Sequence, residues 1–179
     1  MSKKVLVIST SLRAKSNSDE LAQAFAKGAE QAGNTAEIIS LKGKSIGFCI
    51  GCLACQKTQK CVIPDDAVEI AEKIKNSQVL VFATPVYYYG LSGQLKTLLD
   101  RCNPLFPSDY DFRDVYLLAT AADEDDSAME GSINGMQGWI DCFEKARLAG
   151  AVFAGGVTEA GEIKNHPALN KAFDMGRGV

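Results

Sequence analysis

The chain has 179 residues, 46% hydrophobic and 23% charged, with a formal net charge of −3 and a pI of about 5.2. These values are typical of a folded domain and exclude a disordered chain. The acidic balance also argues against non-specific nucleic-acid binding, which needs a basic surface. No apolar run approaches the roughly 18 residues of a membrane span, and the run at 5–8 is too short for a signal peptide. We therefore expect a single cytoplasmic domain over residues 1–179 that binds neither nucleic acid nor membrane.

Strand-like apolar runs alternate with helical patterns along the chain. The strand runs are rich in β-branched residues, whereas the helices carry apolar residues three or four positions apart. In chain order the sequence predicts a strand at 5–8, a helix at 19–32, a strand at 36–41, a helix opened by Pro64-Asp65-Asp66, a strand at 78–83, a helix at 92–102, a strand at 114–120, a helix at 133–149, a strand at 149–155 and a helix at 165–175. The main predicted loops are a cysteine-rich loop at 43–63, a loop at 84–90 and an acidic loop at 123–126.

This order of elements predicts an α/β fold with a doubly wound, five-stranded parallel sheet. In such sheets ligands bind outside the carboxyl ends of the strands, at the point where the strand order reverses. The loops that follow the first, third and fourth strands are therefore the candidate ligand loops.

The loop after the first strand is rich in hydroxyl groups. Residues 9–18 hold five serine or threonine hydroxyls, the Asn17 amide and Arg13, and they lead into a predicted helix N-terminus. Neither the G-x-G-x-x-G pattern nor a Walker A lysine is present in this loop. Hydroxyls, backbone N–H groups and a helix N-terminus together suit a phosphomonoester. The plainer alternative is a polar loop whose serines and asparagine cap the helix.

The loop after the third strand is aromatic. Its sequence, Thr84-Pro85-Val86-Tyr87-Tyr88-Tyr89-Gly90, follows the most apolar strand and stands at the expected ligand edge. Backbone and tyrosine rings in this position are suited to border a flat ring system. The alternative is that the three tyrosines only cover a hydrophobic edge.

Four of the six cysteines fall within thirteen residues, in the pattern Cys49-x2-Cys52-x2-Cys55-x5-Cys61. In a reducing compartment such a group indicates metal or redox chemistry more often than structural disulfides. The spacing is close to the ferredoxin pattern for a [4Fe–4S] cluster, with a longer last gap and with Pro64 displaced from the last cysteine. Zinc, and redox-active thiols without a metal, are the alternatives.

Three residues outside these segments are expected to be structural. Cys102 and Cys142 stand at apolar helical positions and are expected in the core. His166, the single histidine, has no evident partner in the sequence and is expected at the surface rather than in catalysis.

The two ligand loops resemble those of a known family. The pattern Ser9-Thr10-Ser11-Leu12-Arg13 with Ser16-Asn17-Ser18, then Thr84-Pro85-Val86-Tyr87, Ser92-Gly93-Gln94-Leu95-Lys96 and Asp100-Arg101, is similar to the NAD(P)H-dependent FMN reductase family over about residues 1–155. The resemblance implies a flavodoxin-like fold with strand order 2-1-3-4-5 and FMN as cofactor. It implies that the FMN phosphate is bound in the first loop, by Ser9, Ser11, Arg13, Ser16, Asn17 and Ser18. The isoalloxazine ring would then lie against the second and third loops, at Pro85, Val86, Tyr87, Tyr88, Tyr89, Thr120 and Ala121.

The cysteine segment resembles that of the iron–sulfur flavoproteins, which share this fold and carry a [4Fe–4S] cluster beside FMN. This resemblance implies that the cluster is held by Cys49, Cys52, Cys55 and Cys61. It implies an oxidoreductase that passes electrons between NAD(P)H or a ferredoxin-type donor and a small-molecule or protein acceptor. The flavin rather than a side chain would carry the chemistry, in a homodimer or homotetramer. Three alternatives stay open: a cluster-free NAD(P)H:FMN or quinone reductase, a flavodoxin-type electron carrier without turnover of its own, and a non-enzymatic metal-binding or redox-sensing module.

Overall fold

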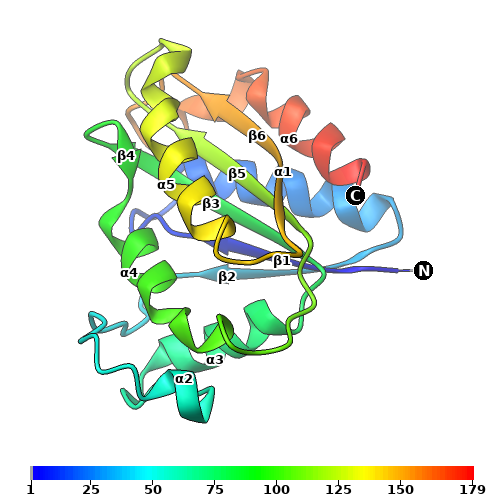
Figure 1. The fold of residues 1–179 in the computed structure, drawn as a ribbon. Helices are drawn as coiled ribbons and strands as arrows, with labels where there is room; N and C mark the ends of the chain where they lie inside the picture. Colours follow the sequence, from blue (N-terminus) through cyan, green and yellow to red (C-terminus); the bar gives the residue numbers. More distant parts are fainter. Residues whose placement is uncertain (1) are drawn as a thin grey trace.

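A computed structural model describes residues 2–179, and its centre is a twisted sheet (Figure 1). Five parallel strands follow one another in the order β2-β1-β3-β5-β6. Their bounds are Lys4–Ser9 (β1), Thr35–Ser40 (β2), Val79–Tyr87 (β3), Asp114–Thr120 (β5) and Arg147–Ala154 (β6). The two-residue strand β4, Gly90–Leu91, is antiparallel to the end of β3. Counted over the parallel strands alone, this is the order 2-1-3-4-5, so the expected strand order is confirmed.

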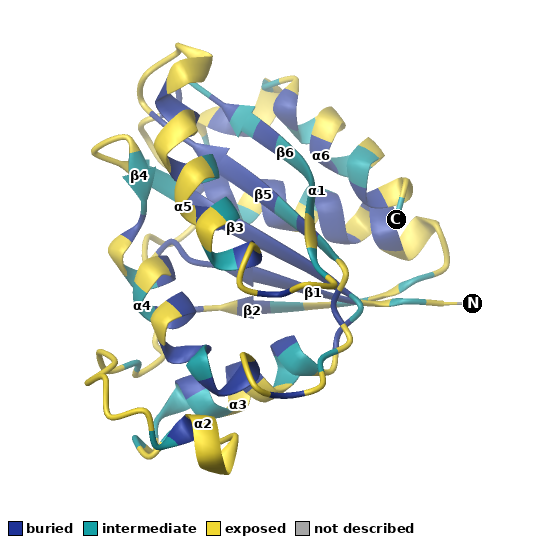
Figure 2. Ribbon diagram, viewed as in Figure 1, coloured by how far each residue is buried: buried dark blue, intermediate teal, exposed yellow. Residues whose placement is uncertain are grey.

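Helices cover both faces of the sheet. Two of them pack against each other on one face, α1 (Asn17–Gln31) and α6 (Ala168–Arg177). The opposite face is covered by α3 (Asp66–Lys75), α4 (Gly93–Arg101) and α5 (Glu130–Ile140). Short helical turns complete the fold, α2 at Cys55–Thr58 and 3-10 turns at Asn103–Leu105, Asp126–Met129 and Glu162–Asn165. In Figure 2 the central strands β1, β3 and β5 are largely buried, whereas the segment around α2 is largely exposed.

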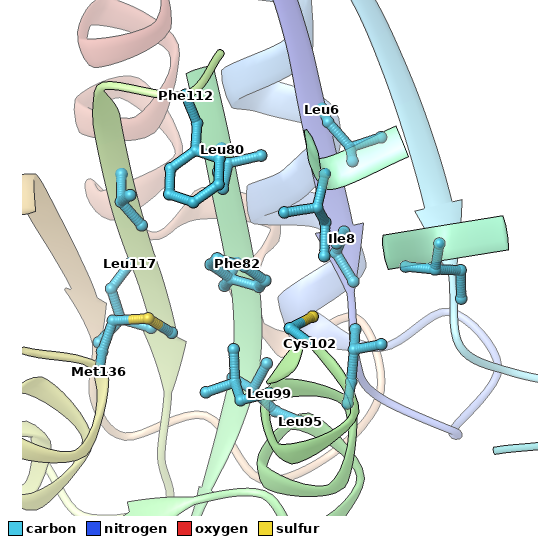
Figure 3. Close-up of a cluster of buried hydrophobic side chains, with 14 of the residues drawn as sticks. Leu6, Ile8, Leu80, Phe82, Leu95, Leu99, Cys102, Phe112, Leu117 and Met136 are labelled. Atoms are coloured by element: carbon cyan, nitrogen blue, oxygen red, sulfur yellow. The ribbon is translucent and has the colours of Figure 1, made fainter. Parts of the chain in front are cut away.

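The core lies on both sides of the sheet because successive side chains of a strand point to opposite faces. In β1, Val5 and Val7 pack toward α1 and α6, whereas Leu6 and Ile8 pack into the opposite cluster beneath α3, α4 and α5. Figure 3 shows this second cluster, in which Phe82 of β3 lies among leucine side chains. A strand that is buried on both faces must be apolar at every position, which explains the continuous apolar runs in the sequence.

The helix predicted at 133–149 is wrong in its second half. Helix α5 runs over Glu130–Ile140, two tight turns follow, and β6 begins at Arg147. Phe143 keeps its apolar contacts outside the helix, since its ring packs against Trp139 at a centroid distance of 4.8 Å. Cys142 was expected in the core but is exposed, because the helix ends at Ile140 and no longer turns this side chain toward the sheet. Within residues 2–179 no helix is long and apolar enough to cross a membrane.

The segment predicted as a loop at 84–90 contains a hairpin instead. Strand β3 continues to Tyr87 and pairs with β4, and Tyr88 and Tyr89 form the turn. Both turn residues have positive φ, 49° at Tyr88 and 59° at Tyr89. This conformation suits a two-residue hairpin turn but is normally taken by Asn and Gly. Two tyrosines give no turn signal, so sequence patterns could not find this hairpin.

Candidate functional site

Three of the strand ends form a pocket at the carboxyl edge of the sheet. The loops after β1 and β5 meet there with the end of β3, the start of α1 and the segment after β6. The cavity measures about 220 Å³. Its lining consists of Ser11, Arg13, Ser16, Asn17, Ser18, Pro85, Val86, Tyr87, Thr120, Ala121, Ala122, Val157 and Thr158. Most of the residues expected to bind FMN therefore surround one cavity.

The hydroxyl loop is held in shape by its own side chains. Ser16 caps α1, since its side chain accepts from Asp19 N at 3.1 Å. Ser18 and Thr120 share a buried hydroxyl–hydroxyl hydrogen bond of 2.9 Å, which joins α1 to the end of β5. Ser9 Oγ donates to the Asp19 carboxylate and is not part of the pocket lining. The helix-capping alternative is thus correct for Ser16, but it does not compete with anion binding, because the first N–H groups of α1 have no partner inside the helix.

Asn17 and Arg13 connect the hydroxyl loop to the segment after β6. Asn17 Nδ2 donates to Glu159 O at 2.9 Å, and its Oδ1 accepts from Gly161 N at 3.1 Å. Arg13 Nη1 donates to Thr158 O at 2.5 Å. Asn17 therefore uses both ends of its amide to fix the pocket wall, whereas the exposed Arg13 guanidinium keeps further N–H groups beside the cavity.

Sequence reasoning missed the wall formed by Val157 and Thr158. Val157 N donates to Ala121 O at 2.9 Å, which extends the pairing of β5 and β6 beyond the strands and brings this wall to the cavity. The position of the segment at the carboxyl end of the fifth parallel strand is the signal that would have found it.

The tyrosine hairpin divides its residues between the cavity and the solvent. Pro85, Val86 and Tyr87 line the cavity, whereas Tyr88 is fully exposed and Tyr89 points to the acidic loop. The Tyr89 hydroxyl donates to Asp123 Oδ2 at 3.1 Å. This carboxylate raises the pKa of the Tyr89 phenol, because the hydrogen bond and the negative charge both favour the protonated hydroxyl. The acidic loop is therefore tethered by Tyr89 rather than free in solvent.

A second pocket lies under the four-cysteine loop, residues 48–62. It measures about 460 Å³ and is lined by all six cysteines of the chain, together with aromatic residues such as Trp139 and Phe143. Cys55 is buried and accepts a hydrogen bond from Asn103 Nδ2 at 3.0 Å, whereas Cys49 and Cys52 are exposed. Among residues 2–179, no three His, Cys, Asp or Glu side chains are close enough together to hold one metal ion.

The donor set of this pocket nevertheless fits an iron–sulfur cluster. Four thiols on one loop are the ligands such a cluster uses. Asn103 donates to Cys55, and Arg101, whose buried Nε has no partner among the described residues, lines a neighbouring cavity together with Cys61. Metal ligands on a loop come together when the metal binds, because binding supplies the free energy that orders them.

A family model for NADPH-dependent FMN reductases matches residues 3–134, which is more than half of the chain and includes both ligand loops and the four motif cysteines. The chain belongs to the NADPH-dependent FMN reductase family. Curated relatives of this family member include an iron–sulfur flavoprotein of Archaeoglobus fulgidus, 39% identical over 108 residues, which cover 60% of this chain and 55% of that protein. The chain thus spans about half the length of that relative. An iron–sulfur flavoprotein of Methanosarcina thermophila is 26% identical over 96% of this chain and 87% of its own.

Solved structures show the same fold. An NAD(P)H:quinone oxidoreductase from Methanothermobacter marburgensis has a TM-score of 0.77 and 20% identity, and the match covers 99% of this chain and 96% of that one. At this identity the likeness supports the flavodoxin-like fold of the FMN reductase family.

Proposed function

We propose that this protein is an FMN-dependent oxidoreductase that also carries a [4Fe–4S] cluster and passes electrons from NAD(P)H or a ferredoxin-type donor to an acceptor. The single observation that carries the proposal is the combination of a hydroxyl-rich pocket at the sheet edge with a four-cysteine loop elsewhere in the chain. Family membership and relatives named iron–sulfur flavoproteins support it. When bound, the two groups would convert between two-electron and one-electron transfer.

In this proposal the first pocket holds FMN. Its phosphate would be bound by the Ser11, Ser16 and Ser18 hydroxyls, by Arg13 and by the N-terminus of α1. Asn17 would fix the wall beside it. The flavin ring would lie against Pro85, Val86 and Tyr87 on one side and Thr120 and Ala121 on the other. Tyr88, Tyr89 and Ser9 would act on the shape of the site rather than on the flavin, since none of them borders the cavity.

The four cysteines Cys49, Cys52, Cys55 and Cys61 would hold the cluster. Their loop is exposed, and we propose a homodimer or homotetramer, in the cytoplasm, in which a second subunit covers it. A nicotinamide nucleotide would serve as electron donor by stacking its ring on the flavin, which requires no separate nucleotide-binding motif in the protein.

A cluster-free NAD(P)H:FMN or quinone reductase is the second candidate. The separation of the thiols favours it, because no three of the potential metal ligands in residues 2–179 stand together. In that protein the cysteines would act as thiols. A flavodoxin-type carrier would differ from both by negligible NAD(P)H oxidation.

The deciding experiment is anaerobic purification followed by a visible spectrum and assays of iron, sulfide and released flavin. We expect FMN with about four iron and four sulfide per chain, and oxidation of NADH or NADPH by the same sample. The variant Cys52→Ser/Cys55→Ser should lose iron and keep FMN. The control Cys142→Ser, at a cysteine that lines the same pocket but is not one of the four motif cysteines, should keep both. Flavin without iron in the unchanged protein would support the cluster-free reductase instead.

A further inference from the structure

Arg101, at the C-terminal end of α4, is a cation whose side chain has no exposed surface. Its guanidinium forms a two-pronged pair with Asp65, in which Nη1 donates to Oδ2 at 2.6 Å and Nη2 donates to Oδ1 at 2.8 Å. Burying a charge costs free energy unless the charge is paired and hydrogen-bonded, and an apolar side chain at the same position would avoid that cost. The other contacts of the pair indicate what it does in this fold.

The pair joins the two ends of the four-cysteine loop. Arg101 Nη1 also donates to Gly47 O at 2.8 Å, and Nη2 donates to Ile63 O at 3.1 Å. Asp65 Oδ2 accepts from Gly47 N at 2.8 Å. Gly47 stands two residues before the first motif cysteine, and Ile63 stands two residues after the last. One buried guanidinium therefore closes the loop that carries all four thiols.

A further contact holds the middle of the loop. Asn103, in the turn after α4, donates to Cys55 Sγ at 3.0 Å. Among the four motif cysteines, all within the described residues, Cys55 alone is buried. Arg101 also has a buried Nε–H without a partner among residues 2–179, and its side chain lines the same cavity as Cys61. A thiolate sulfur with negative charge accepts hydrogen bonds from N–H groups such as these.

We propose that Arg101 and Asn103 are positioning residues for the cluster ligands: Arg101 holds the two ends of the four-cysteine loop together, and Asn103 orients Cys55. This inference rests on the proposed function, in which these cysteines bind the cluster. A loop loses conformational freedom when it gathers several ligands around one centre. Because the two ends of the loop are already held together and Cys55 is already oriented, part of this loss of conformational freedom has occurred before the cluster binds. Donors to the thiolate sulfurs also stabilise negative charge, which favours the reduced form of a cluster.

The role of the Arg101–Asp65 pair, which we call the clamp, is tested by how tightly the chain binds iron. Arg101→Met removes the N–H donors while keeping a long side chain. It is combined with Asp65→Asn, so that no carboxylate is left without its cation. During anaerobic reconstitution with iron and sulfide, we expect this double variant to bind iron about 10–100-fold more weakly than the unchanged chain, with FMN retained. Arg101→Lys keeps the charge without the two-pronged geometry and should restore only part of the affinity.

The Asn103 contact is tested by a reduction potential. Asn103→Leu keeps the side-chain size and removes the donor, so we expect a more negative midpoint potential of the cluster in a redox titration followed by electron paramagnetic resonance. A purely structural role would leave this potential unchanged. The matched control is Lys44→Gln, which removes the exposed ion pair with Asp66, 3.2 Å long, beside the same loop end. This control should keep both the iron affinity and the potential.

Equal iron affinity and equal potential in variants that retain FMN would overturn the inference. If the unchanged chain takes up no iron, the proposed cluster fails, and the clamp is then tested on the metal-free protein. Peptide mass spectrometry after iodoacetamide treatment should show faster labelling of Cys55 in Asn103→Leu and in Arg101→Met/Asp65→Asn than in the unchanged chain. Equal labelling rates would refute the positioning roles independently of the cluster.

Discussion

At the scale of single residues, two cysteines outside the four-cysteine loop stand in opposite surroundings. Cys102 ends α4 and is buried against the sheet, and this burial raises the pKa of its thiol to about 12. Cys142 follows α5 and is exposed, with Sγ donating to Gly138 O at 3.5 Å. Because the thiolate is the reactive form, burial and a raised pKa both suppress the reactivity of Cys102. Helical spacing alone made the two residues look alike.

The difference predicts selective alkylation. At pH 8 and without denaturant, iodoacetamide should label Cys142 within minutes and leave Cys102 unmodified, because only the first has an accessible thiol. Peptide mass spectrometry of time points measures both sites in one sample, and addition of guanidinium chloride provides the control in which both react. Rapid labelling of Cys102 in the folded protein would show that the end of α4 opens.

At the scale of secondary-structure elements, the contact between α1 and α6 depends on two glycines. A Cβ atom on Gly28 would overlap the Phe173 carbonyl oxygen, and one on Gly176 would overlap the Phe25 carbonyl oxygen. The two helices approach so closely that backbone contacts backbone, which no larger residue permits. Helix α6 also packs on β6, and the chain between β6 and α6 contains Thr158, which lines the first pocket.

Gly28→Ala should therefore destabilise the protein although alanine favours a helix. We expect the free energy of unfolding to fall by about 1–3 kcal/mol, because the added methyl group must push the helices apart. The matched control is Gly138→Ala in α5, where a Cβ meets nothing within 4 Å. That substitution should raise stability by up to about 1 kcal/mol. Urea unfolding of both variants followed by circular dichroism measures the two effects; equal changes would contradict the close packing.

At the scale of the whole molecule, stability is tied to carboxylates that are bound in the folded state. Burial alone would raise the pKa of Asp65, but hydrogen bonds from Arg101, Gly47 and Ala67 outweigh it and lower the pKa below its ordinary value of 3.8. The pKa values of Asp125 and Glu162 are also lowered by hydrogen bonds. A carboxylate with a lowered folded-state pKa contributes stability that is fully present above its unfolded pKa and is lost as the pH falls through the folded value.

The melting temperature should therefore fall as the pH decreases below about 3.8, the ordinary value for Asp65. Asp65→Asn should be less stable than the unchanged protein at pH 7, and the difference should shrink in this acid range, because the unchanged carboxyl becomes neutral there. Asp125→Asn, at an exposed carboxylate, should show a much smaller change. Calorimetric scans between pH 7 and pH 3 test this, and a difference that stays constant with pH would rule out Asp65 as the titrating group.

The sequence by itself determined the α/β class of the fold, the positions of its parallel strands along the chain and the loops that follow them, whereas the strand order came from the family resemblance. These features depend on neighbours along the chain: apolar runs, helix starts, hydroxyls after a strand and the spacing of cysteines. Such patterns predict which loops reach the carboxyl edge, because every parallel strand ends at the same edge of a sheet. The extents of α5 and of β3 were mispredicted, since aromatic packing and the pairing of β4 with β3 decided them.

Only the tertiary structure decided which partners individual side chains contact. Arg101 contacts Gly47, 54 positions earlier in the chain, and Asn17 contacts Glu159, 142 positions later. The family resemblance had implied that Asn17 binds the phosphate, and the sequence analysis had given Arg101 no role at the cysteine loop. The physical reason is that a buried hydrogen-bonding group must find a partner wherever the fold supplies one, and the fold, unlike a local pattern, brings distant segments together.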